Sequence, residues 1–299
     1  MDLLKEIANI TGFINRHPLT AGKKSAAYLR FLRWQIGSRL AGMPLVMPFI
    51  GNTRLVIDRG MTGATGNVYV GLHEFNDMSL VLHLLREKDL FGDIGANVGV
   101  YTVLASGVCR SRTIAVEPLP STFERLLDNL NINNLGALVS AYCVGLSSER
   151  GHLTFTDNLD TMNHVVWSSD ASGTKIQVDT VDNIFSAEVP LLLKLDVEGY
   201  EAPVLMGAQQ TLSNPALKGL IVELNGSGKR YGFDDTKTHA NILSYGFAPF
   251  RYLPHERQLY PLKNIGSPET QNVLYIRDLD FVFNRLLSAP GFSVLGRRV

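Results

Sequence analysis

Three carboxylates in this chain stand where ligand chemistry would need them. Asp93, Glu117 and Asp196 each lie at the carboxyl end of a short apolar run with the character of a β-strand. Parallel strands joined by right-handed crossovers present these ends at one edge of a sheet, and ligands bind outside that edge. The sequence therefore predicts that the three side chains share one site.

A glycine turn, GANVG at residues 95–99, follows the first of these carboxylates and precedes a segment able to begin a helix. The dinucleotide fingerprint G-x-G-x-x-G needs a glycine at its second position, so that a pyrophosphate can approach the backbone. Asn97 occupies that position here, and Asp93 would repel a pyrophosphate. Both residues favour a cationic ligand without phosphate, such as S-adenosylmethionine. Glu117 can hydrogen-bond ribose hydroxyls, but nicotinamide sites use an acidic residue in the same way, so a nicotinamide-dependent oxidoreductase is the second enzyme hypothesis.

A second polar group lies in the segment KLDVEGYE at residues 194–201. Lys194 stands inside an apolar strand, and burying an unpaired ammonium costs on the order of several kcal/mol. We therefore expect it to pair with Asp93, Asp196 or Glu223. Asp196 is the first candidate for the base that would remove the proton of an attacking hydroxyl.

His164 is the second candidate base, because a histidine titrates near neutral pH. Its neighbour Asn163 and the acidic Glu198 are candidate substrate contacts. Asp196 and Glu198 could also hold Mg²⁺ through their oxygen atoms. Two carboxylates without a third ligand are too few, so no metal site is assigned.

Apolar strands alternate with helices from residue 90 onward. Near-continuous apolar strands of this kind predict an α/β fold, in which a mostly parallel sheet is covered by helices on both faces. The predicted strands are Leu90–Ile94, Arg112–Val116, Leu138–Val144, Pro190–Asp196 and Gly219–Glu223, with closing strands at Phe247–Leu253, Arg257–Leu262 and Asn272–Arg277.

Residues 1–75 are predicted to form an N-terminal extension of helix and short strands, and residues 76–299 to form the ligand-binding domain. Thr53–Asp58 and Asn67–Gly71 are expected to pair as strands around a glycine-rich turn. The first 40 residues have helical spacing with interspersed lysines and arginines. Such a basic helix is expected to pack on the domain, and binding to a membrane surface is the alternative.

The composition is that of an ordinary soluble enzyme, with 299 residues of which 45% are hydrophobic and 19% charged. Lys plus Arg and Asp plus Glu number 28 each, so no overall field favours nucleic acid as a partner. The two cysteines fit a reducing compartment, and the first ten residues lack the apolar core of a signal peptide. We therefore expect a cytoplasmic protein, at most peripheral at the inner membrane surface.

Three segments, in this order along the chain, resemble the FkbM-type S-adenosylmethionine-dependent methyltransferases. They are DIGANVGVYTVLAS from residue 93, AVEPLPSTFERLLDNLNIN from residue 115 and LLLKLDVEGYEAPVLMGAQ from residue 191. The likeness extends over residues 67–277. It implies a class I methyltransferase (Rossmann-like) fold with seven strands, the last one antiparallel. It also implies O-methylation of a hydroxyl on a sugar, glycolipid or secondary metabolite.

The resemblance further implies where each ligand would bind. The turn Asp196–Glu198 would lie beside the reacting centre, with a small molecule or glycan as the methyl acceptor. A non-catalytic module that keeps the fold and binds a glycan or a partner is the alternative from another class. The residues expected to hold the cofactor are Asp93, Gly95, Ala96, Asn97, Gly99, Glu117 and Pro118, with Glu74 closing over the ligand.

Overall fold

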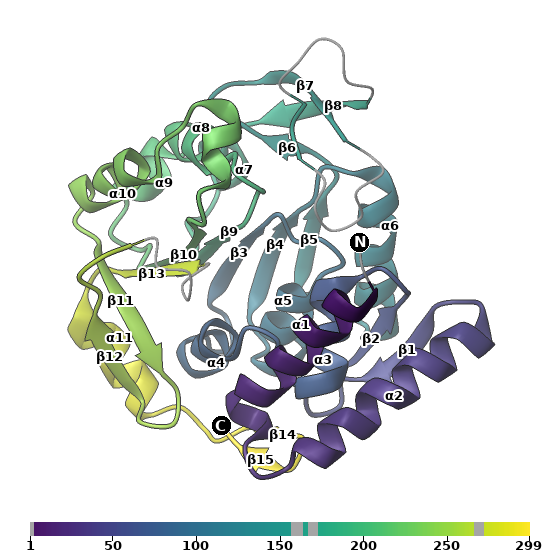
Figure 1. Cartoon of the computed structure of the whole chain (residues 1–299). Coiled ribbons are helices and arrows are strands. Elements are labelled where there is room, and N and C mark those ends of the chain that lie inside the picture. Colours follow the sequence, from purple (N-terminus) through teal and green to yellow (C-terminus); the bar gives the residue numbers. More distant parts are fainter. Residues whose placement is uncertain (1–2, 157–163, 167–172, 266–271) are drawn as a thin grey trace.

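An eight-stranded sheet forms the centre of the molecule, and helices cover both of its faces (Figure 1). The computed structural model describes residues 3–156, 164–166, 173–265 and 272–299. In spatial order the strands are β12 (Gln258–Pro261), β11 (Ala248–Leu253), β13 (Asn272–Ile276), β10 (Gly219–Glu223), β9 (Leu192–Leu195), β3 (Leu90–Ile94), β4 (Arg112–Val116) and β5 (Val139–Tyr142).

The five strands from β10 to β5 run parallel to one another, which confirms the predicted α/β class with a mostly parallel sheet. Strand β13 is antiparallel to both of its neighbours, β10 and β11. The expected number of seven strands is wrong, because β12 folds back on β11 as an additional antiparallel edge strand. A short turn joins these two strands, and Arg257 adopts a φ of 55° in it, so the pairing is local in sequence.

The order of the parallel strands reverses at β3, with β4 on one side of it and β9 on the other. A reversal of this kind opens a crevice outside the carboxyl ends of the two central strands, where ligands bind. Asp93 of β3 lies opposite Lys194 of β9 in the strand register. The topology therefore brings the two predicted polar groups to one place.

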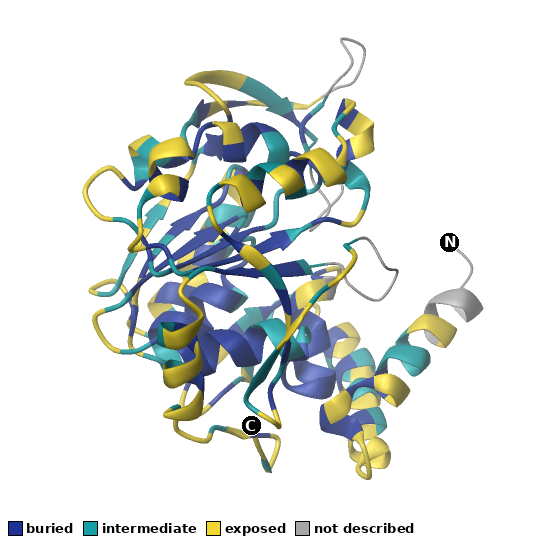
Figure 2. Cartoon of the chain, turned by 90° about the vertical axis from the view of Figure 1, so that its left-hand side faces the viewer, coloured by how far each residue is buried: buried dark blue, intermediate teal, exposed yellow. Residues whose placement is uncertain are grey.

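The central strands are largely buried (Figure 2). Their successive residues pack into two different cores, which explains why these strands are apolar throughout. Leu193 and Leu195 of β9 contribute to one core, and Leu192 contributes to the other. The covering helices are α4 (Phe75–Leu84), α5 (Val100–Thr102) with the π-helical turn Val103–Val108, α6 (Pro120–Ile132), α7 (Val181–Ile184), α8 (Glu201–Met206), α9 (Gln209–Ser213), α10 (Asp235–Ser244) and α11 (Leu279–Leu287).

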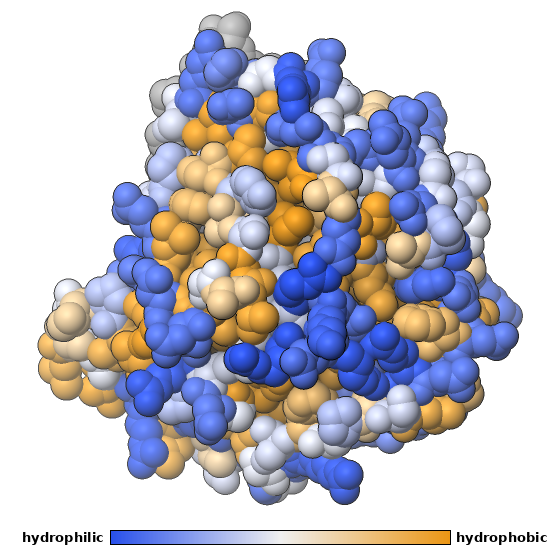
Figure 3. Space-filling model, turned by 180° about the vertical axis from the view of Figure 1, so that it is seen from behind, coloured by the Kyte–Doolittle hydropathy of each residue, from blue (hydrophilic) through white to orange (hydrophobic). Residues whose placement is uncertain are grey.

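The N-terminal segment packs on the same body and shares a core with it. Ile14, Trp34 and Leu55 are buried together with Val98 of the glycine turn and Leu126 of α6. Seen from behind, this segment forms a projection whose surface is partly apolar (lower left in Figure 3). Its elements are α1 (Leu3–Arg16), a 3₁₀ turn (Pro18–Thr20), α2 (Lys24–Ala41), the hairpin β1 (Leu45–Pro48) and β2 (Arg54–Ile57), and α3 (Thr62–Val70).

The expected strand at Asn67–Gly71 is wrong, because these residues lie in and directly after helix α3. The strand that pairs with β2 is β1 instead. Residues 64–72 are buried without interruption, so packing against α2 outweighs the strand preference of the valines and the tyrosine. The Asn67 side chain donates to the Gly63 carbonyl oxygen at 2.9 Å, one helical turn back.

A small three-stranded sheet stands apart from the central one. It consists of β6 (Gly145–Leu146), β8 (Thr174–Asp179) and β7 (Gly151–Phe155). A single bridge connects Phe155 to Val165. This side sheet carries apolar residues, among them Leu146 and Phe155, toward the carboxyl ends of the central strands.

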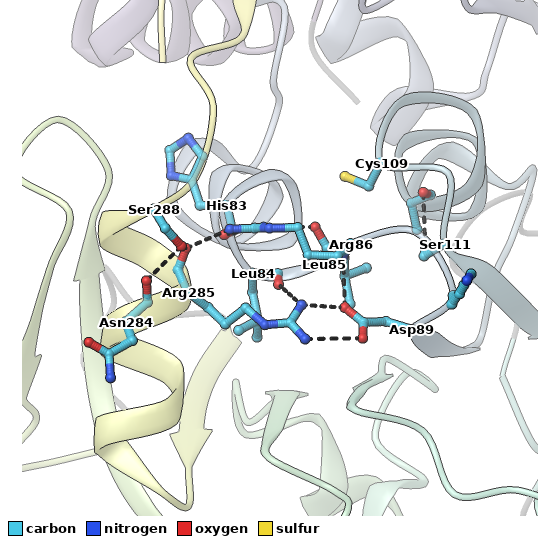
Figure 4. A network of polar contacts seen from close by, with 12 residues as sticks. His83, Leu84, Leu85, Arg86, Asp89, Cys109, Ser111, Asn284, Arg285 and Ser288 are labelled. Carbon is cyan, nitrogen blue, oxygen red and sulfur yellow. Dashed lines mark hydrogen bonds and ion pairs between the residues drawn. The ribbon is translucent and has the colours of Figure 1, made fainter.

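A polar network fixes the start of β3 to helix α11 (Figure 4). The two terminal guanidinium nitrogens of Arg285 donate to the Asp89 carboxylate, at 2.6 and 3.3 Å, and the Arg86 backbone N–H donates to the same carboxylate at 2.7 Å. The Arg86 side chain in turn donates to the Arg285 carbonyl oxygen.

Among the described residues, no helix is both long enough and apolar enough to cross a bilayer.

Candidate active site

A cavity of about 440 Å³ opens at the carboxyl ends of β3, β4, β9 and β10, at the predicted edge of the sheet. It brings together most of the residues proposed from the sequence. Gly99 and His164 do not line it, and Asn163 lies outside the described residues. The proposed residues that do line it are Glu74, Asp93, Gly95, Ala96, Asn97, Glu117, Pro118, Asp196 and Glu198.

The glycine turn is held directly against the second polar segment. Gly95 has a φ of 73°, and a Cβ atom added to it would lie 1.8 Å from the Asp196 carbonyl oxygen. The Asp196 backbone N–H donates to the Ile94 carbonyl oxygen at 3.1 Å. Only glycine fits at residue 95, since a side chain there would separate the two walls of the cavity.

Asn97 and Gly99 shape the turn in different ways. Asn97 adopts a φ of 52°, a left-handed conformation that asparagine tolerates better than most residues. Its side-chain oxygen accepts from the Val98 backbone N–H at 2.8 Å. Gly99 has a φ of 84°, and a Cβ atom there would lie 2.4 Å from the Leu126 side chain. Gly99 therefore serves the packing of α6 and contributes no surface to the cavity.

Asp93 is a buried carboxylate with one oxygen left without a partner. Its side chain is 1% exposed, and Oδ2 accepts from the Thr102 hydroxyl at 2.6 Å. Oδ1 is buried and has no hydrogen-bond partner among the described residues. Burial raises the pKa of Asp93, and the nearby Lys194 opposes that change. An orphaned acceptor in a cavity wall calls for a donor from a ligand, and a cationic donor suits a carboxylate best.

Glu117 directly follows β4, and its carboxylate binds backbone N–H groups of the glycine turn and of the segment after β4. Its two carboxylate oxygens accept from the N–H groups of Asn97 at 3.0 Å and Leu119 at 3.1 Å. Burial raises the pKa of Glu117 to about 7, and these two hydrogen bonds oppose the rise. Each oxygen retains a further lone pair, so the carboxylate can also accept from two neighbouring hydroxyls of a ligand.

Lys194 finds its partner in Asp196, one of the three residues expected for it. The Lys194 side chain is 4% exposed, and its ammonium nitrogen lies 2.7 Å from Asp196 Oδ2 and 4.9 Å from the centre of the Tyr101 ring. The Tyr101 hydroxyl donates to Glu74 at 2.7 Å, and Asn272 donates to the other Glu74 oxygen at 2.9 Å. Asp196, Glu74 and Asp93 together raise the pKa of Lys194 against the effect of its burial, so this lysine stays charged.

Glu223, which the sequence suggested only as a partner for Lys194, forms an acidic cluster with Asp196 and Glu198. Asp196, Glu198 and Glu223 place carboxylate oxygens within 4.8 Å of one another. Burial and the neighbouring charges raise the pKa of Glu198 to about 7 and that of Glu223 to about 9. Glu223 ends strand β10, so the rule that identified the other three carboxylates would have found it too. Such oxygens can accept from hydroxyls or bind a hard divalent cation.

The two candidate bases differ in position. The Asp196 side chain is 28% exposed and faces the cavity. The backbone of His164 pairs with Thr156, and its neighbour Val165 is the residue that lines the cavity. The structure therefore brings Asp196 to the site and leaves His164 outside the cavity wall.

Comparison with known proteins gives one family. The Methyltransferase FkbM domain matches residues 93–249, which include the glycine turn and the acidic cluster. Hexuronic acid methyltransferase AglP of Haloferax volcanii is 32% identical over 150 residues, which cover 49% of this chain and 60% of that protein. Methyltransferase 1 of Beauveria bassiana is 30% identical over 198 residues, covering 57% of this chain and 78% of that protein.

The solved structures that match are more distant. A precorrin-6y C5,15-methyltransferase from Geobacter metallireducens aligns over 77% of this chain and 97% of its own, with 13% identity and a TM-score of 0.40. A score of this size adds no weight to the assignment of the fold, which rests on the strand order described above.

Proposed function

The chain belongs to the FkbM methyltransferase family, and we propose that it transfers a methyl group from S-adenosylmethionine to a hydroxyl of a sugar-containing acceptor. The observation that carries the proposal is the orphaned oxygen of Asp93, a buried carboxylate acceptor in the cavity wall. The ammonium group of the cofactor would satisfy it. The adjacent turn carries Asn97 where a pyrophosphate would need glycine.

The cavity residues fit the rest of the cofactor as well. Glu117 can accept from the ribose hydroxyls. The apolar side chains of Leu119, Leu146 and Phe155 line the same cavity and would pack against the adenine ring. When bound, S-adenosylmethionine supplies an electrophilic methyl group on a positively charged sulfur. The carboxylates of the cavity favour that charge.

The acceptor hydroxyl must lose a proton as it attacks, and Asp196 is the proposed base. Its carboxylate faces the cavity, and the Lys194 ammonium at 2.7 Å holds it in one orientation. Methyl transfer is an in-line displacement, so positioning of the attacking oxygen contributes much of the rate. Glu223 carries a proton at neutral pH, because its pKa is raised to about 9, and it can donate a hydrogen bond to a second acceptor oxygen.

The charge of the cavity favours an acceptor without a carboxylate of its own. Among the described lining residues, Lys194 is the one lysine or arginine, and Glu223 is protonated at neutral pH. The other acidic lining residues are Glu74, Asp93, Glu117, Asp196 and Glu198. A neutral sugar hydroxyl avoids repulsion by this set. The relative from Haloferax volcanii is named for a hexuronic acid, so we propose that this chain differs from it in the charge of its acceptor.

The proposal is tested by methyl transfer and by cofactor preference. The protein is incubated with S-adenosylmethionine labelled in the methyl group, and with matched neutral glycosides and glucuronides. We expect label on the neutral glycoside. In parallel, S-adenosylhomocysteine at about 100 times its Kd should stabilise the fold by about 2.7 kcal/mol. A rise in melting temperature with NAD⁺ and none with S-adenosylhomocysteine would overturn the assignment.

A further inference from the structure

Helix α2 exposes a line of large apolar side chains. Leu29, Leu32, Ile36 and Leu40 are 48%, 52%, 59% and 82% exposed, and their spacing of three or four residues places them on one face of the helix. We call these four residues the outer face of α2. Met43, just beyond the helix, is 64% exposed and extends the apolar surface.

The opposite face of the same helix is already used. Ala27, Trp34 and Ser38 are buried, and Trp34 packs into the core that the N-terminal segment shares with the main body. At 3.6 residues per turn these residues lie about 180° from the outer face. A helix on the surface of a globular protein ordinarily has one apolar stripe, turned toward the core. Helix α2 has this exposed apolar face in addition to its buried face, so the outer face is available to an occupant outside the folded chain.

The stretch of sequence that contains the outer face carries positive charge only. No aspartate or glutamate occurs between Glu6 and Asp58, a stretch that contains seven lysines and arginines, although the whole chain has no net charge. By helical spacing Arg33 and Arg39 flank the outer face, one on each side. The other basic residues of the stretch are Arg16, Lys23, Lys24, Arg30 and Arg54.

The C-terminus adds to this charge at the start of α2. The terminal ribbon of β14 (Ser293–Val294) and β15 (Arg297–Arg298) lies there, and the Arg297 side chain donates to the Ala21 carbonyl oxygen. Segments joined by a contact between residues 276 positions apart thus build one basic surface. The chain as a whole has no net charge, yet positive charge is concentrated on this surface. A partner of opposite charge would recognise such a surface.

We propose that the outer face of α2 docks on an anionic lipid membrane. An apolar helix face bordered by lysine and arginine is the arrangement that inserts at the boundary between headgroups and acyl chains, while the basic residues contact anionic headgroups. A second copy of the same chain fits less well, because two such faces would bring arginines of one sign together. The proposal does not rest on the methyltransferase activity.

Docking of this kind would hold the catalytic cavity close to the bilayer. Helix α3 packs against α2 on one side, and its residues Gly63, Ala64 and Asn67 line the cavity on the other. Helices α2 and α3 therefore lie between the lipid-facing surface and the site. An acceptor attached to a lipid could reach the cavity without leaving the membrane.

The test is flotation of the full chain with lipid vesicles. We expect binding to phosphatidylcholine vesicles that contain about a third phosphatidylglycerol, weak binding to pure phosphatidylcholine, and release in about 0.5 M NaCl. The double variant Leu32→Glu with Ile36→Glu should lower the bound fraction about tenfold or more. Arg33→Gln with Arg39→Gln should weaken binding to the anionic vesicles only.

A matched control is available on the far side of the molecule. Leu243 and Leu287 are exposed leucines of α10 and α11, so Leu243→Glu with Leu287→Glu adds the same charge elsewhere. This control should bind like the unchanged protein, and circular dichroism should show that every variant is folded. Equal binding to both kinds of vesicle, no binding, or full binding by the variant Leu32→Glu with Ile36→Glu would overturn the proposal. So would light scattering that finds a dimer which this variant dissociates.

Discussion

Replacing Gly95 by alanine tests the contact on which the geometry of the site depends. The Cβ atom of the new residue would lie 1.8 Å from the Asp196 carbonyl oxygen, whereas real Cβ atoms do not come closer than 3.0 Å to such a neighbour. The turn and the Asp196 segment must therefore move apart by more than 1 Å. That movement would displace the wall that carries Asp93 from the wall that carries the proposed base.

Two effects set the size of the loss in stability. Alanine at a φ of +73° costs about 1–2 kcal/mol relative to glycine. Forcing an extra methyl group into a filled space costs about 1–3 kcal/mol more. We therefore expect the Gly95→Ala variant to lose about 2–5 kcal/mol in free energy of unfolding. Because a misplacement of about 1 Å can cost about 100-fold in rate, turnover should fall more than stability alone would explain.

Urea unfolding and calorimetric titration with S-adenosylhomocysteine measure the two effects separately. Gly63→Ala is the matched control, because Gly63 also lines the cavity but a Cβ atom there would meet nothing within 4 Å. We expect that variant to keep its stability and its affinity for the ligand. A Gly95→Ala variant with unchanged stability and unchanged affinity would refute the view that this contact sets the spacing of the two walls.

Three further predictions follow from the charges of the site and the scaffold. The folded-state pKa of Glu117 is about 7, above its ordinary value of 4.5. Ionisation of Glu117 should therefore lower the free energy of unfolding of the ligand-free protein as pH rises from 4.5 to about 7. Over the same range the affinity for S-adenosylmethionine should increase, because the ionised carboxylate is the better acceptor. Urea unfolding and calorimetry at pH 5, 6 and 8 check both signs, and an affinity that falls with rising pH would count against the role of Glu117. Asp196→Asn should reduce turnover about 100-fold or more with little change in cofactor affinity, and normal turnover would exclude it as the base. Asp89→Ala leaves the partly buried Arg285 unpaired, so it should cost about 3–5 kcal/mol in stability without changing cofactor affinity, as urea unfolding and calorimetry would show.

The location of the candidate cavity could be predicted from the sequence because it depends on topology. Asp93, Glu117 and Asp196 end three apolar strands, and parallel strands must bring their ends to one edge. Glu223 obeys the same rule at the end of β10. The sequence suggested Glu223 only as a possible partner for Lys194, whereas the structure places it in the acidic cluster with Asp196 and Glu198.

Features that depend on contacts between distant segments could not be predicted. The hydrogen bond from Asn272 to Glu74 joins residues 198 positions apart, and no local sequence pattern predicts it. Helix α3 contains valines and a tyrosine that favour strands, and it is helical because it is buried against α2. His164 has the right chemistry for a base, but only the structure could place its backbone beside Thr156 and its neighbour Val165 in the cavity wall.

The most direct test of the central claim is a calorimetric titration of S-adenosylhomocysteine into the unchanged protein and into the Glu117→Ala variant. We predict one ligand bound per chain, and affinity about tenfold or more weaker in the variant, since each lost hydrogen bond to a charged acceptor contributes about 1.5–3 kcal/mol. Circular dichroism establishes that both proteins are folded. Absence of binding to the unchanged protein, or equal affinity in the two, would contradict the claim that this cavity holds S-adenosylmethionine.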